Sequence, residues 1–168
     1  MRRSKVMVRL ICVVWVIISL LSGCKAAVYD DIKMTHDAIY ADDIQIADDQ
    51  DKVFYTMSNK SSSGETNYSN RFGSFSGKDT VWTIQSESGG TLNLSYDVSV
   101  QQGECKLVLV DPEGEVQILQ EGEGVGEANL TVSQGESRLM TVGKSAKGAV
   151  TMDISDLDGC TAEKKTGF

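Results

Sequence analysis

The chain has 168 residues, 24 of them acidic and 16 basic, with a formal net charge of −8. This length suits one ordinary domain. Because proteins bind nucleic acid by neutralising its phosphates with Lys and Arg, the acidic balance excludes charge-driven nucleic-acid binding. It also predicts repulsion from anionic lipid surfaces, so charge alone would not bring the protein to a membrane.

The N-terminus has the organisation of an export signal. Four basic residues within the first nine positions precede an apolar run from Leu10 to Leu21. A bilayer-spanning helix needs roughly 20 apolar residues. The run is shorter than that, which favours a cleaved signal peptide over residues 1–23; an uncleaved membrane anchor is the alternative.

The apolar run ends in Leu21-Ser22-Gly23-Cys24. This motif resembles the lipobox of bacterial lipoproteins. The resemblance implies cleavage after Gly23 and attachment of diacylglycerol to the sulfur of Cys24, often with acylation of the new amino group. Two or three acyl chains hold a protein firmly on a bilayer. The expected location is therefore the extracytoplasmic face of the cell membrane, with the lipid on Cys24 as the membrane contact.

Residues 24–70 are predicted to form a tether. Aspartates recur between residues 30 and 51, and residues 58–70 have the Ser, Asn and Gly content of a flexible linker. Isoleucines in the acidic part could support a short helix or strand. The single histidine, His36, lies in this stretch. A catalytic base must be held rigidly against its nucleophile, so we expect no catalytic role for it.

From residue 71 to 156 the apolar residues follow the period of two that marks half-buried strands. Alternation is clearest from Leu92 to Val100, while both faces are apolar from Cys105 to Val110, which indicates a central strand. About seven short strands at this spacing predict an all-β fold, an antiparallel β-sandwich of jelly-roll type, with residues 157–168 as a C-terminal tail. The expected turns are Gly89-Gly90, Gln102-Gly103, Asp111-Pro112-Glu113-Gly114, Gly122 to Gly126, Gln134-Gly135 and Lys147-Gly148.

Two segments of this region also carry a family resemblance. A Ser-Gly-Lys-Asp opening at residues 76–79 precedes Trp82, and the strand Leu107 to Val110 runs into an Asp-Pro-Glu-Gly turn. This layout resembles the pre-peptidase C-terminal type of β-sandwich found in exported bacterial proteins. The resemblance implies an accessory or interaction module rather than a reaction.

Two cysteines remain in the exported part. Cys105 and Cys160 could form a disulfide in an oxidising compartment, which would close a long loop and stabilise the fold by a few kcal/mol. The alternative is that Cys105 is a small buried hydrophobic residue on a strand and Cys160 lies in the tail.

Carboxylates are the remaining candidates for ion binding. Asp111 and Glu113 flank one predicted turn, and Asp153 and Asp156 lie near the end of the last predicted strand. Calcium prefers several such oxygens in flexible loops, so these four are weak calcium candidates, although clustered acids are more often solvated loops. No zinc-ligand spacing occurs, and no cofactor is expected.

The aromatic residues Phe72, Phe75, Trp82 and Tyr96 could form a platform for a sugar ring. Trp82 and Tyr96 share the strand parity of core positions, which favours packing instead.

These patterns predict a non-enzymatic binding or interaction module held at the cell membrane by lipid, with an envelope protein or a glycan as its partner. The alternatives are a carbohydrate- or calcium-binding module and a hydrolase that uses Asp and Glu pairs. Paired carboxylates can catalyse acid–base chemistry when their surroundings separate their pKa values. That alternative requires a deep pocket with two convergent acids.

Overall fold

The computed structural model describes residues 30–165, and the predicted signal peptide and Cys24 lie outside the described residues. The chain divides into two compact units, residues 1–35 and residues 36–168. In the first, the described residues are helical, and the Thr35 hydroxyl donates to the Asp31 carbonyl at 2.9 Å. Within residues 30–165 no helix has the length and apolarity that crossing a bilayer requires.

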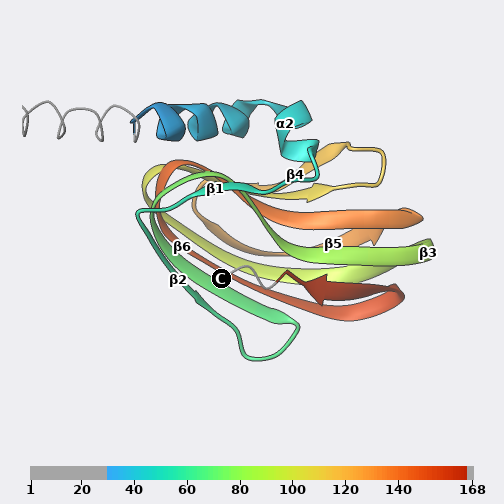
Figure 1. The fold of residues 1–168 in the computed structure, drawn as a ribbon. Coiled ribbons are helices and arrows are strands. Elements are labelled where there is room, and N and C mark those ends of the chain that lie inside the picture. Colours follow the sequence, from blue (N-terminus) through green and yellow to red (C-terminus); the bar gives the residue numbers. More distant parts are fainter. Residues whose placement is uncertain (1–29, 166–168) are drawn as a thin grey trace, which may run out of the picture. The chain divides into compact units, whose positions relative to one another are not determined.

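The second unit is almost entirely antiparallel β-structure, with two short helical elements at its start (Figure 1). In chain order its elements are η1 (Ala38–Ala41), α2 (Asp43–Ala47), β1 (Lys52–Phe54), β2 (Met57–Ser61), β3 (Asn67–Val110), β4 (Val116–Glu121), β5 (Gly124–Val132) and β6 (Gly135–Lys164).

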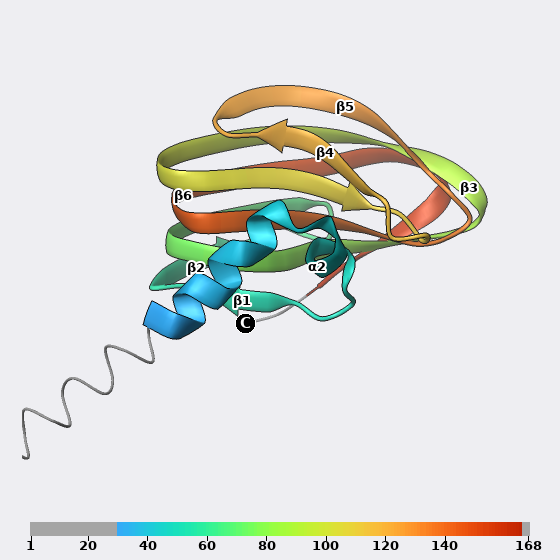
Figure 2. The same ribbon diagram turned by 90° about the horizontal axis from the view of Figure 1, so that it is seen from above.

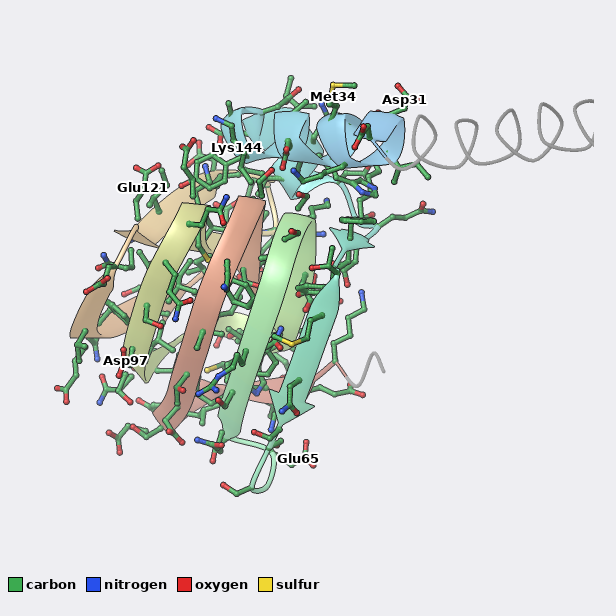
Figure 3. All side chains as sticks on the ribbon, turned by 90° about the vertical axis from the view of Figure 1, so that its left-hand side faces the viewer. Asp31, Met34, Glu65, Asp97, Glu121 and Lys144 are labelled. Carbon is green, nitrogen blue, oxygen red and sulfur yellow. The ribbon has the colours of Figure 1, made fainter. Side chains whose placement is uncertain are left out.

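Strands β3 and β6 are long because each one bends and contributes to both layers of a sandwich. In the front layer, β6 residues 148–154 lie between two stretches of β3, residues 67–72 and residues 94–100. Strand β2 pairs with the first stretch and β5 with the second. Figure 3 shows these five stretches side by side, from β5 through β3, β6 and β3 again to β2.

The back layer repeats this arrangement with the other halves of the same strands. Here β6 residues 135–143 lie between β3 residues 77–86 and β3 residues 105–110. Strand β4 pairs with the second stretch, while β1 and the last stretch of β6 pair with the first. Figure 2 shows this layer from above, with α2 over it. The prediction of an all-β antiparallel sandwich is therefore confirmed.

Three expected turns are bends inside continuous strands rather than hairpins. Two of the bends, at Gly89-Gly90 and Gln102-Gly103, lie in β3, and the third, at Lys147-Gly148, lies in β6. The hydrogen-bonded pairing between β3 and β6 continues on both sides of each bend, with register shifts there. Gly89 and Gly103 adopt φ of 91° and 73°, a conformation that glycine reaches without a steric penalty. Each bend carries a strand from one layer to the other while its hydrogen-bonded partner bends with it.

The core between the layers contains the aromatic residues considered as a sugar platform. Phe72, Phe75 and Trp82 are 2 %, 0 % and 0 % exposed, which confirms packing as their role. Tyr96 is half-buried against the same cluster, and its hydroxyl lies 3.3 Å from Gln120 Oε1 of β4. Phe72, Phe75 and Trp82 are therefore not available as an open stacking surface.

The folded unit extends beyond the range 71–156 expected from the sequence. It begins at His36, and β6 continues to Lys164. Residues 36–51, which we call the strap, bury Ile39, Tyr40 and Ile46 in a second apolar cluster with Val108, Val110, Met140 and Val142 on the back layer. The two-sided apolar pattern of residues 105–110 arises here, because one face of that strand meets the core and the other meets the strap.

Candidate functional site

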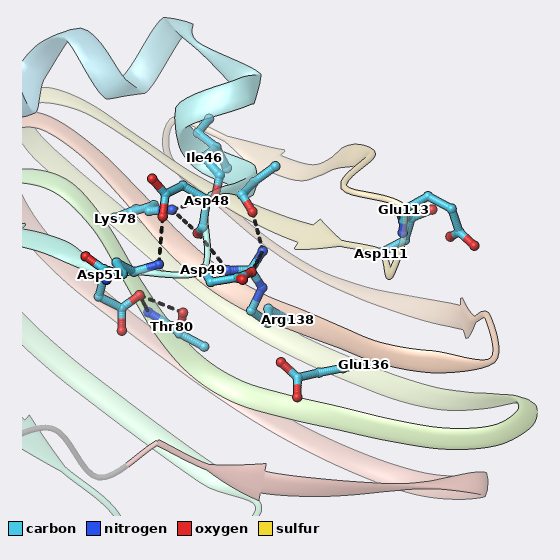
Figure 4. A network of polar contacts seen from close by, with 12 residues as sticks. Ile46, Asp48, Asp49, Asp51, Lys78, Thr80, Asp111, Glu113, Glu136 and Arg138 are labelled. Atoms are coloured by element: carbon cyan, nitrogen blue, oxygen red, sulfur yellow. Dashed lines mark hydrogen bonds and ion pairs between the residues drawn. The ribbon is translucent and has the colours of Figure 1, made fainter.

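The strap is attached to the back layer by two cations that bind the end of α2. Lys78 Nζ donates to the Ile46 carbonyl at 3.0 Å and also to the Asp48 carbonyl. Arg138 donates to the same Asp48 carbonyl at 2.7 Å and to the carbonyl of Ala47 (Figure 4). The last carbonyls of a helix have no partner within the helix, so positive side chains stabilise it there.

Two aspartates attach the ends of the strap. The Asp37 carboxylate accepts hydrogen bonds from Ser76 Oγ, Ser145 Oγ and Ser145 N, each at 2.7 Å. The Asp51 carboxylate accepts from Thr80 N and Oγ1 and forms an ion pair with Lys165 at 2.9 Å. Acids that suggested a solvated tether in the sequence are therefore structural acceptors. The strap covers the apolar part of the outer face of the back layer, whereas Gln85 and Glu136 of the same layer stay exposed.

Burial lowers the pKa of Lys78 from 10.5 to about 8. Between pH 8 and pH 10.5, Lys78 is protonated in the unfolded chain but has lost its proton in the folded chain. The free energy of unfolding contributed by Lys78 should therefore rise with pH from 8 to 10.5 and stay constant below pH 8. We expect the difference in this free energy between the natural protein and Lys78→Met, measured by urea denaturation, to grow in favour of the natural protein over this window. A difference that stays constant from pH 6.5 to 10 would contradict the assignment.

In contrast, no element within residues 36–165 covers the outer face of the front layer, which we call the open face (Figure 3). Its side chains come from the exposed or half-buried positions of five adjacent stretches, and most are small and polar. They are Glu127, Asn129 and Val125 on β5; Asn93, Ser95, Asp97 and Ser99 on β3; Ala149, Thr151, Asp153 and Ser155 on β6; Asn67, Ser69 and Arg71 on β3; and Asn59 and Ser61 on β2.

Amide and carboxylate groups on this face are linked across the strands. Asn129 Nδ2 donates to Asn93 Oδ1 at 2.7 Å, and Asn93 Nδ2 donates to Asp156 Oδ2 at 2.7 Å. Asn67 Nδ2 donates to Asp153 Oδ2 at 2.8 Å. These bonds orient the planar polar groups, which keep further lone pairs and protons for a ligand.

Three adjoining hollows lie on the open face. The first, of about 450 Å³, is lined by Asn93, Asn129 and Asp156, and the second, of about 400 Å³, is lined by Asp97 and Asp153 among others. They share Ser95 and Glu127. A third hollow of about 340 Å³ continues past Ser99 to Arg71 and Lys147. The first two hollows form one depression, and the third lies one row farther along the same β3–β6 strand pair.

The calcium candidates are not gathered into one site. Asp111 Oδ1 accepts hydrogen bonds from the backbone N–H groups of Glu113 and Glu115, which closes the β3–β4 turn. Asp153 and Asp156 lie instead on β6, where they accept from asparagines of the open face. Over residues 30–165, no three His, Cys, Asp or Glu side chains are grouped so as to hold a metal ion.

Cys105 and Cys160 are free thiols, so the disulfide considered from the sequence is not formed. Cys105 pairs with Gly143 at one end of a β6 stretch, whereas Cys160 pairs with Ser86, which lies opposite Gly135 at the other end. A disulfide requires Cα atoms within about 7 Å, and this register separates the two residues. The alternative of Cys105 as a buried apolar residue is the correct one, and burial raises its pKa to about 12.

His36 lies at the start of the strap, and its Nδ1 atom is buried without a hydrogen-bond partner among the described residues. Its pKa is lowered, first by burial and then by the nearby charge of Lys52. The adjacent Asp37 binds serines, but no hydrogen bond connects those serines to the imidazole.

Sequence reasoning did not single out the open face. Its signal is present in the sequence as the polar residues between the apolar ones, for example Asn93, Ser95 and Asp97 between Leu92 and Val98. Such residues are typical of any solvated sheet face. Only the pairing of β3 with β5 and β6 places them beside the polar residues of those strands.

Comparisons with known proteins give distant likenesses. No family model matches the chain, and no curated protein matches it. Among solved structures, an exo-β-1,3-galactanase from Phanerochaete chrysosporium is 10 % identical with a TM-score of 0.39, over 63 % of this chain and 27 % of the galactanase chain. The chain thus spans about a quarter of that enzyme.

Two further solved structures show that these likenesses extend to different kinds of protein. A carbohydrate-binding module of Cellvibrio mixtus lichenase 5A, solved in complex with cellotriose, is 13 % identical with a TM-score of 0.33, over 67 % of this chain and 93 % of the module. The CENP-C cupin domain of Drosophila melanogaster is 14 % identical with a TM-score of 0.28, over 62 % of this chain and 76 % of the domain. All three TM-scores lie below 0.5, so no functional statement about this chain follows from them.

Proposed function

We propose that this chain is a lipid-anchored, extracytoplasmic β-sandwich module that binds an extended carbohydrate on its open face and does not alter it chemically. The observation that carries the proposal is the difference between the two outer faces. The strap covers the apolar part of the outer face of the back layer, whereas no strap lies over the front layer, which presents a depression lined by amides, hydroxyls and carboxylates.

The chemistry of the depression suits sugar hydroxyl groups. Each hydroxyl both donates and accepts hydrogen bonds, and oriented Asn and Asp side chains offer matching partners. The strands under the depression are paired on both sides, so a ligand there meets side chains and not a backbone edge. That arrangement favours a glycan over an extended peptide, which gains its affinity from unpaired strand edges. Val125, 79 % exposed, adds an apolar contact.

The predicted lipid on Cys24 is compatible with an accessible open face. About 12 residues separate Cys24 from His36, which limits the tether to about 40 Å even when fully extended. The strap that follows lies on the back layer, the side opposite the depression. The module would therefore sample glycans close to the membrane that holds it.

Isothermal titration of the mature soluble chain with a panel of neutral and charged oligosaccharides tests the proposal. We expect Asn93→Ala to weaken binding about tenfold, because this residue joins Asn129 to Asp156 and its loss removes about 1.4 kcal/mol of binding free energy. Gln117→Ala is the matched control, since Gln117 is an exposed polar residue on β4 of the back layer. Equal affinity of the natural protein and Asn93→Ala, or no binding by any oligosaccharide, would overturn the proposal.

A further inference from the structure

The depression on the open face has a direction, because its rows of side chains follow the register of one strand pair. Successive outward positions of β3 lie opposite those of β6: Asn93 opposite Ser155, Ser95 opposite Asp153, Asp97 opposite Thr151, and Ser99 opposite Ala149. Rows of this kind are about 6.6 Å apart. We call this series of rows the track.

Charge is segregated along the track. The first three rows and their neighbours carry the carboxylates of Asp97, Glu127, Asp153 and Asp156. The far end carries two cations: Arg71 lies opposite Ala149, and Lys147 lies opposite Gln102. Within residues 30–165 none of these six side chains takes part in an ion pair.

This pattern differs from that of a face charged only for solubility, where both signs are interspersed. Here the acids are together at one end, and the two cations lie one or more rows away at the other end. Charges of one sign in a depression raise the local concentration of oppositely charged groups. The two ends of the track are therefore complementary to opposite charges on one extended ligand.

Resting on the proposed function, we infer that the ligand is an amphoteric oligosaccharide, with an amino sugar at the Asp97–Asp153 end of the track and a carboxylate-bearing sugar at the Arg71–Lys147 end. The four acids outnumber the two cations, so the amino group contributes more to affinity than the carboxylate does. Exposed charge pairs of this kind contribute up to about 1 kcal/mol each. They act over about 10 Å at 0.1 M salt and less at higher salt.

The test uses a tetrasaccharide that has glucosamine at one end and glucuronic acid at the other, together with its N-acetylated form and its carboxyl-reduced form. With the natural mature chain at low salt, we expect the amphoteric form to bind at least fivefold more tightly than either blocked form. The advantage should shrink at 0.5 M salt. Each blocked form lacks one charge of the amphoteric form, so comparing it with the amphoteric form isolates one end of the track.

Two double variants test which end of the track binds which charged group of the ligand. Asp97→Asn with Asp153→Asn should abolish the preference for the free amine and keep the preference for the carboxylate. Arg71→Gln with Lys147→Gln should abolish the preference for the carboxylate and keep the preference for the free amine. Glu115 is an exposed acid on the β3–β4 turn, so the control Glu115→Gln should change neither preference. Equal affinity for all three forms would overturn the amphoteric assignment while the proposed glycan binding stands. Failure of every form to bind would overturn both.

Discussion

Replacing Ile46 with alanine should lower the free energy of unfolding by about 3 kcal/mol, measured by urea denaturation. The side chain is 0 % exposed and packs with Val108, Val110, Met140 and Val142 beneath α2. Truncating a buried isoleucine loses the transfer free energy of the removed atoms and leaves a cavity, a combined cost of 2–5 kcal/mol in well-packed sites.

Ile44 provides a matched control on the same short helix. It lies two positions earlier and is 86 % exposed, so Ile44→Ala should change the free energy of unfolding by less than about 0.5 kcal/mol. Similar effects of the two substitutions would show that the strap does not pack on the back layer. The covered outer face, and with it the contrast that carries the proposed function, would then be lost.

Replacing Cys24 with serine should release the protein from the membrane. Serine has no thiol to receive diacylglycerol, and a chain this acidic gains no compensating attraction from anionic lipid. Because stable anchoring needs more than one acyl chain, we expect membrane partition to fall at least about 100-fold. Metabolic labelling with a fatty acid, followed by fractionation of membranes and mass spectrometry of the N-terminus, measures the change.

Cys12 supplies the control for this experiment, since it lies within the predicted signal peptide. Cys12→Ser should be labelled and membrane-bound like the natural protein. A native protein that begins at Met1, or one whose Cys24 sulfur is unmodified, would contradict the predicted anchoring. Glycan binding by the soluble module would still be testable, because the open face belongs to the folded unit alone.

The strand pattern was readable from the sequence, but the path of the strands was not. Alternation from Leu92 to Val100 identified a half-buried strand, and the Asp111 to Gly114 turn is a true reversal between β3 and β4. Gly89-Gly90 and Lys147-Gly148 have equally strong turn composition, yet the chain only bends there. Local composition reports that the backbone can turn, whereas the partner strand decides whether it reverses or bends.

In the strap, local composition likewise fails to predict what the charged residues contact. Asp37 and Asp51 belong to a run of acids whose composition is typical of a solvated tether. Their carboxylates accept hydrogen bonds from Ser76, Ser145 and Thr80, which are between 29 and 108 positions away in the sequence. No local pattern can indicate acceptors whose donors are this remote.

By itself, the sequence determined the all-β class and the aromatic core, because both depend on composition or on a period of two along one strand. Only the tertiary structure decided that Cys105 and Cys160 stay apart, that the strap covers one layer, and that the polar rows of the other layer form a track with opposite charges at its ends. Each of these depends on which strands become neighbours. Strand pairing is a long-range property, since a shift of one residue would turn every side chain to the other face.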